Sequence, residues 1–188
     1  MIKKNKKRCD WAERGDVLMR EYHDKEWGVP SHDDRHLFEM LTLEGAQAGL
    51  SWQTILNKRQ GYKKAFDNFN AVKISKYSKA KIAVLLKNPG IVRNRLKVGS
   101  VVTNAAAFLA VQKEFGSFDK YIWQFTGGKT KNNNINSMKQ LPCNTVDSDN
   151  MSKDLKKRGF RFVGTTICYS FMQATGMVND HMNTCDLK

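Results

Sequence analysis

The sequence lacks an apolar run that could cross a bilayer. Its apolar stretches are short, as from Ile82 to Leu86, whereas a membrane-spanning helix needs about 20 consecutive apolar residues. The lysine-rich segment from Met1 to Arg8 is not followed by the apolar core of a secretory signal peptide. We therefore expect a soluble intracellular protein located in the cytoplasm.

The sequence is also poor in cysteine and proline. It has four cysteines, which are Cys9, Cys143, Cys168 and Cys185. No two of them form a Cys-x-x-Cys pair, so a thioredoxin-like redox site has no support. A cytosolic chain of this length needs no disulfides, so free thiols or metal ligands are favoured.

Acidic residues are few relative to basic ones. The 188 residues include 32 Lys and Arg against 18 Asp and Glu, which gives a net charge of +14. Such an excess favours a polyanionic partner, most simply nucleic acid. The alternative is a basic surface that is merely solvated.

Apolar residues follow helical spacing throughout, and no alternating run indicates a sheet. We expect one helix to be capped by Ser31, to run to about Ala48 and to stop at Gly49, with Ser51 capping the next. Further helices are predicted at 79–87, 92–113 and 117–125, and a surface loop at 127–137. These elements predict an all-α protein, with a single domain over 9–188 behind a basic flexible tail of residues 1–8.

One acidic residue falls on an apolar helix face. Leu37, Leu41, Glu44 and Ala48 recur at spacings of four, three and four, which places Glu44 toward the interior. A buried carboxyl group without a partner is costly, so it usually has a function. The alternatives are that a distant arginine or a backbone N–H satisfies Glu44, or that the helix leaves it exposed.

Aromatic residues are concentrated near this helix. Trp11, Tyr22 and Trp27 precede it, and Gly49-Leu50-Ser51-Trp52 follows it. Flat rings beside a lone acidic group in a basic protein suit a pocket that stacks a nucleobase and reads its edge. The alternative is a small aromatic core.

Residues 152–176 predict two helices joined by a tight turn. A short basic helix from Ser152 to Arg158 is expected to stop at Gly159, and Thr165 to cap a second helix after the hairpin 160–164. The turn and the start of the second helix would present backbone N–H groups to a phosphate. Four basic residues surround it, namely Lys156, Lys157, Arg158 and Arg161. An ordinary helical hairpin with a solvated basic face remains the alternative.

Both ends of the chain carry candidate metal ligands. His181 and Cys185 are four residues apart, so one helical turn would bring them together, and Cys9 and His23 could complete the set. Two thiolates and two imidazoles suit tetrahedral zinc. The spacing does not match a common zinc finger, so four unconnected residues remain the alternative.

Taken together, several segments resemble the motifs of the 3-methyladenine DNA glycosylase I family, from about residue 9 to 185 and in the family's order. The matching segments are Cys9-Asp10-Trp11, Tyr22 to Pro30, Leu43 to Trp52, Lys157 to Ala174 and Val178 to His181. The resemblance implies an all-α helix-hairpin-helix DNA glycosylase fold, in which two helical lobes surround a base-binding pocket.

The resemblance also assigns roles to residues. It implies one structural zinc ion that joins the chain ends, held by Cys9, His23, His181 and Cys185. It implies Glu44 as the catalytic and base-reading carboxylate, with Tyr22, Trp27 and Trp52 as aromatic walls. It implies Gly49-Leu50 as the turn that inserts into DNA. The hairpin predicted above adds Arg161, Gly164 and Thr165 as further DNA contacts.

The sequence departs from the family at Met19, where members often have a tyrosine. Many glycosylases of this superfamily use a catalytic aspartate after the hairpin, but this family manages without one. Asp180 follows the hairpin here, and we assign it a structural or supporting role.

The function expected from the resemblance is hydrolytic removal of 3-methyladenine from double-stranded DNA by a monomer, without a lyase step, near the bacterial nucleoid. One alternative is a zinc-stabilised helix-hairpin-helix module that binds distorted DNA without catalysis. The other is a metal-dependent hydrolase, which four protein ligands on zinc disfavour because they leave no open position for water.

Overall fold

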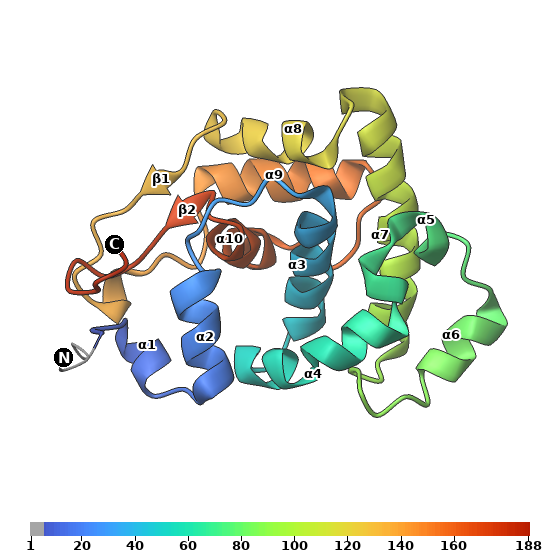
Figure 1. Ribbon diagram of the computed structural model, residues 1–188. Helices are drawn as coiled ribbons and strands as arrows, with labels where there is room; N and C mark the ends of the chain where they lie inside the picture. Colours follow the sequence, from blue (N-terminus) through green and yellow to red (C-terminus); the bar gives the residue numbers. More distant parts are fainter. Residues whose placement is uncertain (1–5) are drawn as a thin grey trace.

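The structure is a computed structural model that describes residues 6–188 (Figure 1). Ten α-helices fall within the described residues: α1 Asp10–Glu13, α2 Val17–Lys25, α3 Asp34–Gln47, α4 Trp52–Ala65, α5 Ala71–Ile74, α6 Lys79–Leu85, α7 Arg95–Phe115, α8 Phe118–Ile122, α9 Val146–Lys157 and α10 Thr165–Ala174. Two short strands, β1 Lys131–Asn132 and β2 Val178–Asn179, and three single 3₁₀ turns complete the chain. None of the described helices combines the length and the hydropathy needed to span a membrane.

Helix α3 lies at the centre of the molecule, between α10 and α7 (Figure 1). Nine of its 14 residues are buried, and they extend around most of the helix rather than along one stripe. A helix that is apolar on most sides belongs in an interior. Helices α4, α7, α8 and α10 pack around it, so α3 is the element against which the rest of the fold is positioned.

The start of α3 differs from the prediction. Asp33, not Ser31, caps the helix, because its side chain accepts the His36 N–H at 2.8 Å. The backbone of Ser31 is held elsewhere, since its N–H donates to Thr175 O and its carbonyl accepts from Trp123 Nε1. The predicted end of α3 and the Ser51 cap of α4 are both confirmed.

A small parallel sheet replaces part of the loop predicted at 127–137. Strand β1 pairs with β2 in the register Lys131↔Val178 and Asn132↔Asn179, and an isolated bridge joins Ile135 to Met182. Strands of two residues are too short to show alternation, so a sequence pattern could not reveal them. The protein is mostly helical, as predicted, but it is not entirely so.

The helix before the predicted hairpin is longer than expected. Helix α9 begins at Val146, where the Thr145 side chain caps it, and Gly159 ends it with φ +91°. Gly164 is the N-cap of α10, and the Thr165 hydroxyl donates to Asp149 instead of capping the helix.

The two ends of the described chain meet (Figure 1). The Lys7 N–H donates to Asp186 Oδ2, and the Asp186 N–H donates to Lys7 O, each at 2.9 Å. Of the tail predicted over residues 1–8, residues 1–5 lie outside the described residues. This pairing brings Cys9 close to the C-terminal segment.

Candidate functional site

A cavity of about 180 Å³ opens beside the C-terminal half of α3. It is lined by side chains from five helices and two connecting segments, namely Trp11, Tyr22, Trp27, Glu44, Gln47, Trp52, Leu141, Ser170 and Gln173. The acidic residue and the four aromatic residues of the predicted cluster, Trp11 included, therefore lie around one cavity. The other four lining residues had not been predicted.

Glu44 faces this cavity from inside the fold. Its side chain is buried, and Oε2 has no hydrogen-bond partner among the described residues. Neither an arginine nor a backbone N–H satisfies that oxygen, so both alternatives are wrong for it, as is the exposed orientation. Desolvation raises the pKa of Glu44 to about 8, so the carboxyl group is mostly neutral at pH 7.

Aromatic rings form the walls of the cavity. The rings of Tyr22 and Trp52 are 5.1 Å apart, and those of Trp11 and Trp27 are 5.0 Å apart in an edge-to-face arrangement. Trp52 Nε1 is buried and has no acceptor among residues 6–188. The cavity thus has flat apolar walls, and two of its lining residues carry unpaired polar atoms, an acceptor on Glu44 and a donor on Trp52.

An ion-pair network behind the cavity connects three helices. Arg59 on α4 donates to Glu26 Oε1, just after α2, and to Glu39 Oε1 on α3, both at 2.7 Å. The two carboxylates and the guanidinium are mostly shielded from solvent. The network holds together the elements that carry Tyr22 and Glu44, and the sequence pattern had given no sign of it.

Asp180 has a supporting position. It is buried and accepts hydrogen bonds from Tyr169 Oη at 2.6 Å, Asn133 Nδ2 at 2.7 Å and Gln173 Nε2 at 2.8 Å. It is not among the residues that line the cavity. Its bond to Gln173 ties it to a residue that does line the cavity.

The turn that follows α3 lies at the rim of the cavity. Gln47 and Trp52, on either side of it, both line the cavity. Gly49 has φ +76°, and the Leu50 N–H closes the turn on Gln47 O at 2.6 Å. Leu50 is 41% exposed, so a large apolar side chain projects beside the mouth of the cavity.

The hairpin between α9 and α10 packs against α3 and α7. The Asn104 side chain on α7 pairs with both backbone polar groups of Arg161, at 2.8 and 3.0 Å. A Cβ placed on Gly45 would lie 3.3 Å from Phe162 Cβ, so the hairpin rests on the residue next to Glu44. The Arg161 side chain is exposed.

Arg158 does not add free positive charge to the hairpin, contrary to expectation. Its guanidinium donates to Glu114 at 2.7 Å and to Asp154 at 2.8 Å. It also lies 4.9 Å from the ring centroids of Phe115 and Tyr121. Arg158 therefore fixes the end of α9 against the end of α7.

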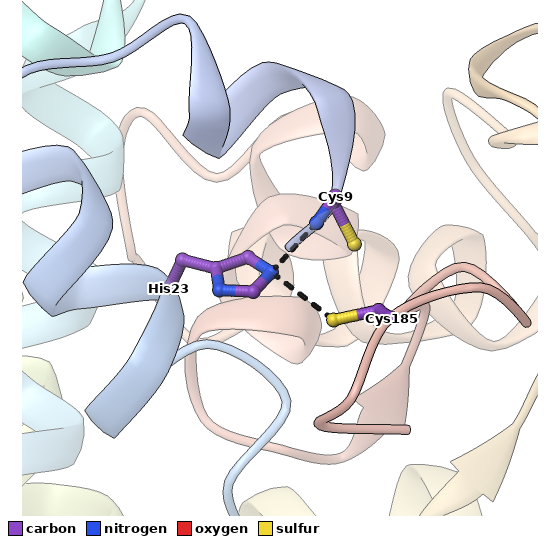
Figure 2. Close-up of side chains that lie close together, drawn as sticks. All are labelled: Cys9, His23 and Cys185. Atoms are coloured by element: carbon purple, nitrogen blue, oxygen red, sulfur yellow. Dashed lines mark hydrogen bonds between the residues drawn. The ribbon is translucent and has the colours of Figure 1, made fainter. Parts of the chain in front are cut away.

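Three of the four predicted metal ligands converge near the joined chain ends (Figure 2). The ligand atoms of Cys9, His23 and Cys185 all lie within 4.8 Å of one another, and all three residues are buried. His181 is not part of that group, but its ring centroid is 4.8 Å from that of His23. Its Nε2 is buried and has no partner among the described residues.

The two histidines are oriented by carboxylate and amide oxygens. His23 Nδ1 pairs with Asp24 Oδ1 at 2.9 Å, and His181 Nδ1 pairs with Asn179 Oδ1 at 2.8 Å. Burial lowers the pKa of His181 to about 4, so its ring is neutral. With Nδ1 paired, each histidine turns Nε2 toward the cluster, an arrangement typical of metal sites. His23 Nε2 accepts the Cys9 N–H at 3.3 Å and lies 3.6 Å from Cys185 Sγ (Figure 2).

The comparisons with known proteins agree on one family. The sequence pattern of the methyladenine glycosylase family matches residues 11–188. The DNA-3-methyladenine glycosylase 1 of Escherichia coli (strain K12) is 45% identical over 178 residues, which cover 95% of each chain. A crystal structure of 3-methyladenine DNA glycosylase I superposes with a TM-score of 0.93 and 48% identity, over 96% of this chain and 98% of that one.

A second solved structure carries a ligand. It is a single-residue variant of 3-methyladenine DNA glycosylase I in complex with 3-methyladenine. It superposes with a TM-score of 0.93 and 34% identity, and covers 96% of this chain and 97% of that one. The similarity to both structures extends over nearly the whole chain.

Proposed function

The chain belongs to the methyladenine glycosylase family, and from that premise we propose that it removes 3-methyladenine from alkylated double-stranded DNA by hydrolysing the N-glycosyl bond. The observation that carries the proposal is the buried Glu44 with an unpaired oxygen in a cavity walled by Tyr22, Trp27 and Trp52. A nucleobase inside a duplex cannot reach such a cavity, so the damaged nucleotide must first leave the stack.

Glu44 accounts for the choice of adenine. A carboxylate oxygen accepts a hydrogen bond from the exocyclic amine of adenine, whereas guanine presents an acceptor oxygen there and is repelled. Methylation at N3 gives the base a positive charge, which favours the ionised form of Glu44. The same charge draws the ring toward the aromatic walls, a cation–π contact of about 2 kcal/mol in a dry site.

The leaving group is already activated, so the pocket does not need a strong acid. Cleavage of the N-glycosyl bond returns the bonding electrons to the base, which leaves neutral. The positive charge passes to the sugar, and water adds to the sugar carbon and releases one proton to solvent. No lysine is among the described residues that line the cavity. A lyase step through a Schiff base on the cavity wall therefore has no amine to form it, which supports a monofunctional glycosylase.

DNA would be held by the hairpin and the turn after α3. Backbone N–H groups at Gly164 and Thr165, together with the exposed Arg161, suit phosphate contacts that do not read sequence. Leu50 would fill the space that the extruded base leaves in the stack. The net charge of +14 favours this association over the whole molecule.

We propose that Cys9, His23, His181 and Cys185 hold one zinc ion. The support is the unpaired buried Nε2 of His181 beside a cluster of two thiols and one imidazole. When bound, the ion would supply structural cross-linking, because four protein ligands leave no position for a reacting water. These residues join α2 and the two chain ends, and none of them lines the base cavity.

The proposed function is tested by chromatography of the bases released from methylated DNA. We expect free 3-methyladenine from the wild-type protein, and about 10- to 100-fold slower release from Glu44→Gln, because a charge-assisted hydrogen bond is lost. Glu21→Gln removes one carboxylate from an exposed site on α2 and should act like the wild type.

Other outcomes separate the alternatives. Binding of damaged DNA without release of any base would indicate a non-catalytic binding module. Release that stops on addition of EDTA to the folded protein would favour a metal-dependent hydrolase. Unchanged release and unchanged discrimination against 7-methylguanine in Glu44→Gln would remove Glu44 from the reaction.

A further inference from the structure

Lys97 is a buried cation that the proposed chemistry does not use. It lies in the first turn of α7, where its N–H donates to the capping side chain of Asn94. Its Nζ donates to Ala46 O at 2.8 Å and to Ala48 O at 2.6 Å. Among residues 6–188, no carboxylate pairs with it, so two backbone carbonyls hold this ammonium group.

Both carbonyls belong to the C-terminal end of α3. Helices α3 and α7 run in opposite directions (Figure 1), since Lys97 reaches the end of α3 and Gln112 bonds to Asp34 at its start. The last carbonyls of a helix have no partner within the helix and carry partial negative charge. The ammonium group of Lys97 satisfies them where water has little access.

Residues 47–50 form a type II turn. Ala48 has φ −42° and ψ 114°, and Gly49 has φ +76°. These angles match the second and third residues of type II, which needs φ above zero at its third residue and therefore favours glycine. The Leu50 N–H donating to Gln47 O closes the turn.

The bond to Ala48 O distinguishes between turn types. A type I turn differs from type II mainly by rotation of the peptide between its second and third residues. Here that peptide carries the Ala48 carbonyl, which Lys97 holds. Rotation to type I would break the Lys97–Ala48 bond and redirect the chain that leads to Leu50.

We propose that Lys97 is a positioning residue that holds the turn 47–50 in its type II form, so that Leu50 projects correctly for insertion into DNA. This inference rests on the proposed function, because it assumes that the turn enters the duplex when a base is extruded. It adds a residue on α7, remote in sequence from both the pocket and the turn. Lys97 contacts neither the base nor the reacting bond.

The test compares a step that needs base extrusion with one that does not. In Lys97→Met, we expect kcat/KM for excision from duplex DNA to fall by about 10- to 100-fold. The reason is that a displacement of about 1 Å in the positioning of the substrate can cost about 100-fold in rate. The Kd for free 3-methyladenine, followed by tryptophan fluorescence, should stay within about twofold, because Lys97, Ala48 and Leu50 are not among the residues that line the cavity. Lys113→Met removes the same charge from an exposed position on the same helix and should match the wild type.

A double-mutant cycle with Leu50 ties the effect to the turn. If Lys97 acts through Leu50, then Leu50→Ala should cost much less in Lys97→Met than in the wild type. Gly49→Ala serves as a second variant if Lys97→Met does not fold. It strains the same turn with Lys97 in place, and it should also slow duplex excision without weakening binding of the free base.

Two outcomes would contradict the inference, and a third would contradict the proposed function. Wild-type excision rates in Lys97→Met would show that the turn does not need Lys97. Equal losses in duplex excision and in binding of free base would show a general structural role only. Failure of the wild type itself to release 3-methyladenine would instead contradict the proposed function.

Discussion

Glu44 should make the protein less stable as the pH rises when no base is bound. Its pKa is about 8 in the fold against an ordinary 4.5, so the folded state keeps the proton that the unfolded chain has released. The stability contributed by the neutral group is complete below about pH 4.5 and is lost progressively up to about pH 8, at about 1.4 kcal/mol per pH unit. Denaturant unfolding should therefore find Glu44→Gln more stable than the wild type at pH 8, with the difference vanishing near pH 4.5.

Glu21→Gln is the matched control for that measurement, because the same substitution at an exposed site leaves the pH dependence unchanged. Equal stability of Glu44→Gln and the wild type at both pH values would mean that the carboxyl group is not desolvated.

The same group predicts a pH dependence of activity in the opposite direction. Capture of a cationic base favours the ionised carboxyl group, so kcat/KM should rise by about tenfold per pH unit and level off above about pH 8. Initial rates on methylated duplex at subsaturating concentration measure this profile. A flat wild-type profile, or the same rise in Glu44→Gln, would assign the titration to another group.

Residue spacing could predict Glu44, but it could not predict the cavity residues that come from distant parts of the chain. Glu44 lies on a long helix whose apolar stripe fixes which side faces inward, so three apolar residues sufficed to locate it. Ser170 and Gln173 lie on α10, and Leu141 lies between elements. The place of Ser170 and Gln173 in the cavity depends on how α10 packs against α3, which no local pattern encodes.

At the scale of elements, the predictions succeeded where local chemistry decides the outcome. Ser51 caps α4 and Gly159 ends α9, because a hydroxyl group at an N-cap and a positive φ act on adjacent residues. They failed where distant partners decide it. Ser31 is held by Thr175 and Trp123, and β1 forms only because it meets β2.

The hairpin between α9 and α10 should contribute to DNA affinity but not to sequence preference. Arg161→Ala should weaken binding to damaged and undamaged duplex by a similar factor, and it should lower the slope of log K against log salt by about 0.9. Binding titrations over a range of salt concentrations measure both effects. Arg35→Ala, at an exposed site in the first turn of α3, should change the slope much less, and equal slopes for both variants would show that Arg161 meets no phosphate.

At the scale of the molecule, the basic side chains are not all free to contact a phosphate. Arg8, Arg59 and Arg158 are each committed to carboxylates within the fold. These ion pairs leave the net charge unchanged, but they fix where positive charge can meet a phosphate. The total of +14 therefore indicates a polyanionic partner, whereas only the structure distinguishes Arg161 from Arg158.

The chain ends should be the part of the molecule that metal stabilises. Cys9 and Cys185 lie at opposite ends of the sequence, yet both belong to the cluster around His23, so a bound ion would close the fold across its whole length. Metal that binds only the folded state, at a free concentration 100 times its Kd, adds about 2.7 kcal/mol to the free energy of unfolding. Each kcal/mol shifts Tm by about 2–4 °C in a domain of this size.

We expect about one zinc per chain by elemental analysis, with Cys185→Ser losing zinc and melting about 5–10 °C lower. Cys143→Ser makes the same substitution at an exposed free cysteine, and it should keep both zinc and Tm. If purified wild-type protein contains no zinc, or if Cys185→Ser matches Cys143→Ser in Tm, the two ends are held together by hydrogen bonds such as Lys7–Asp186 alone.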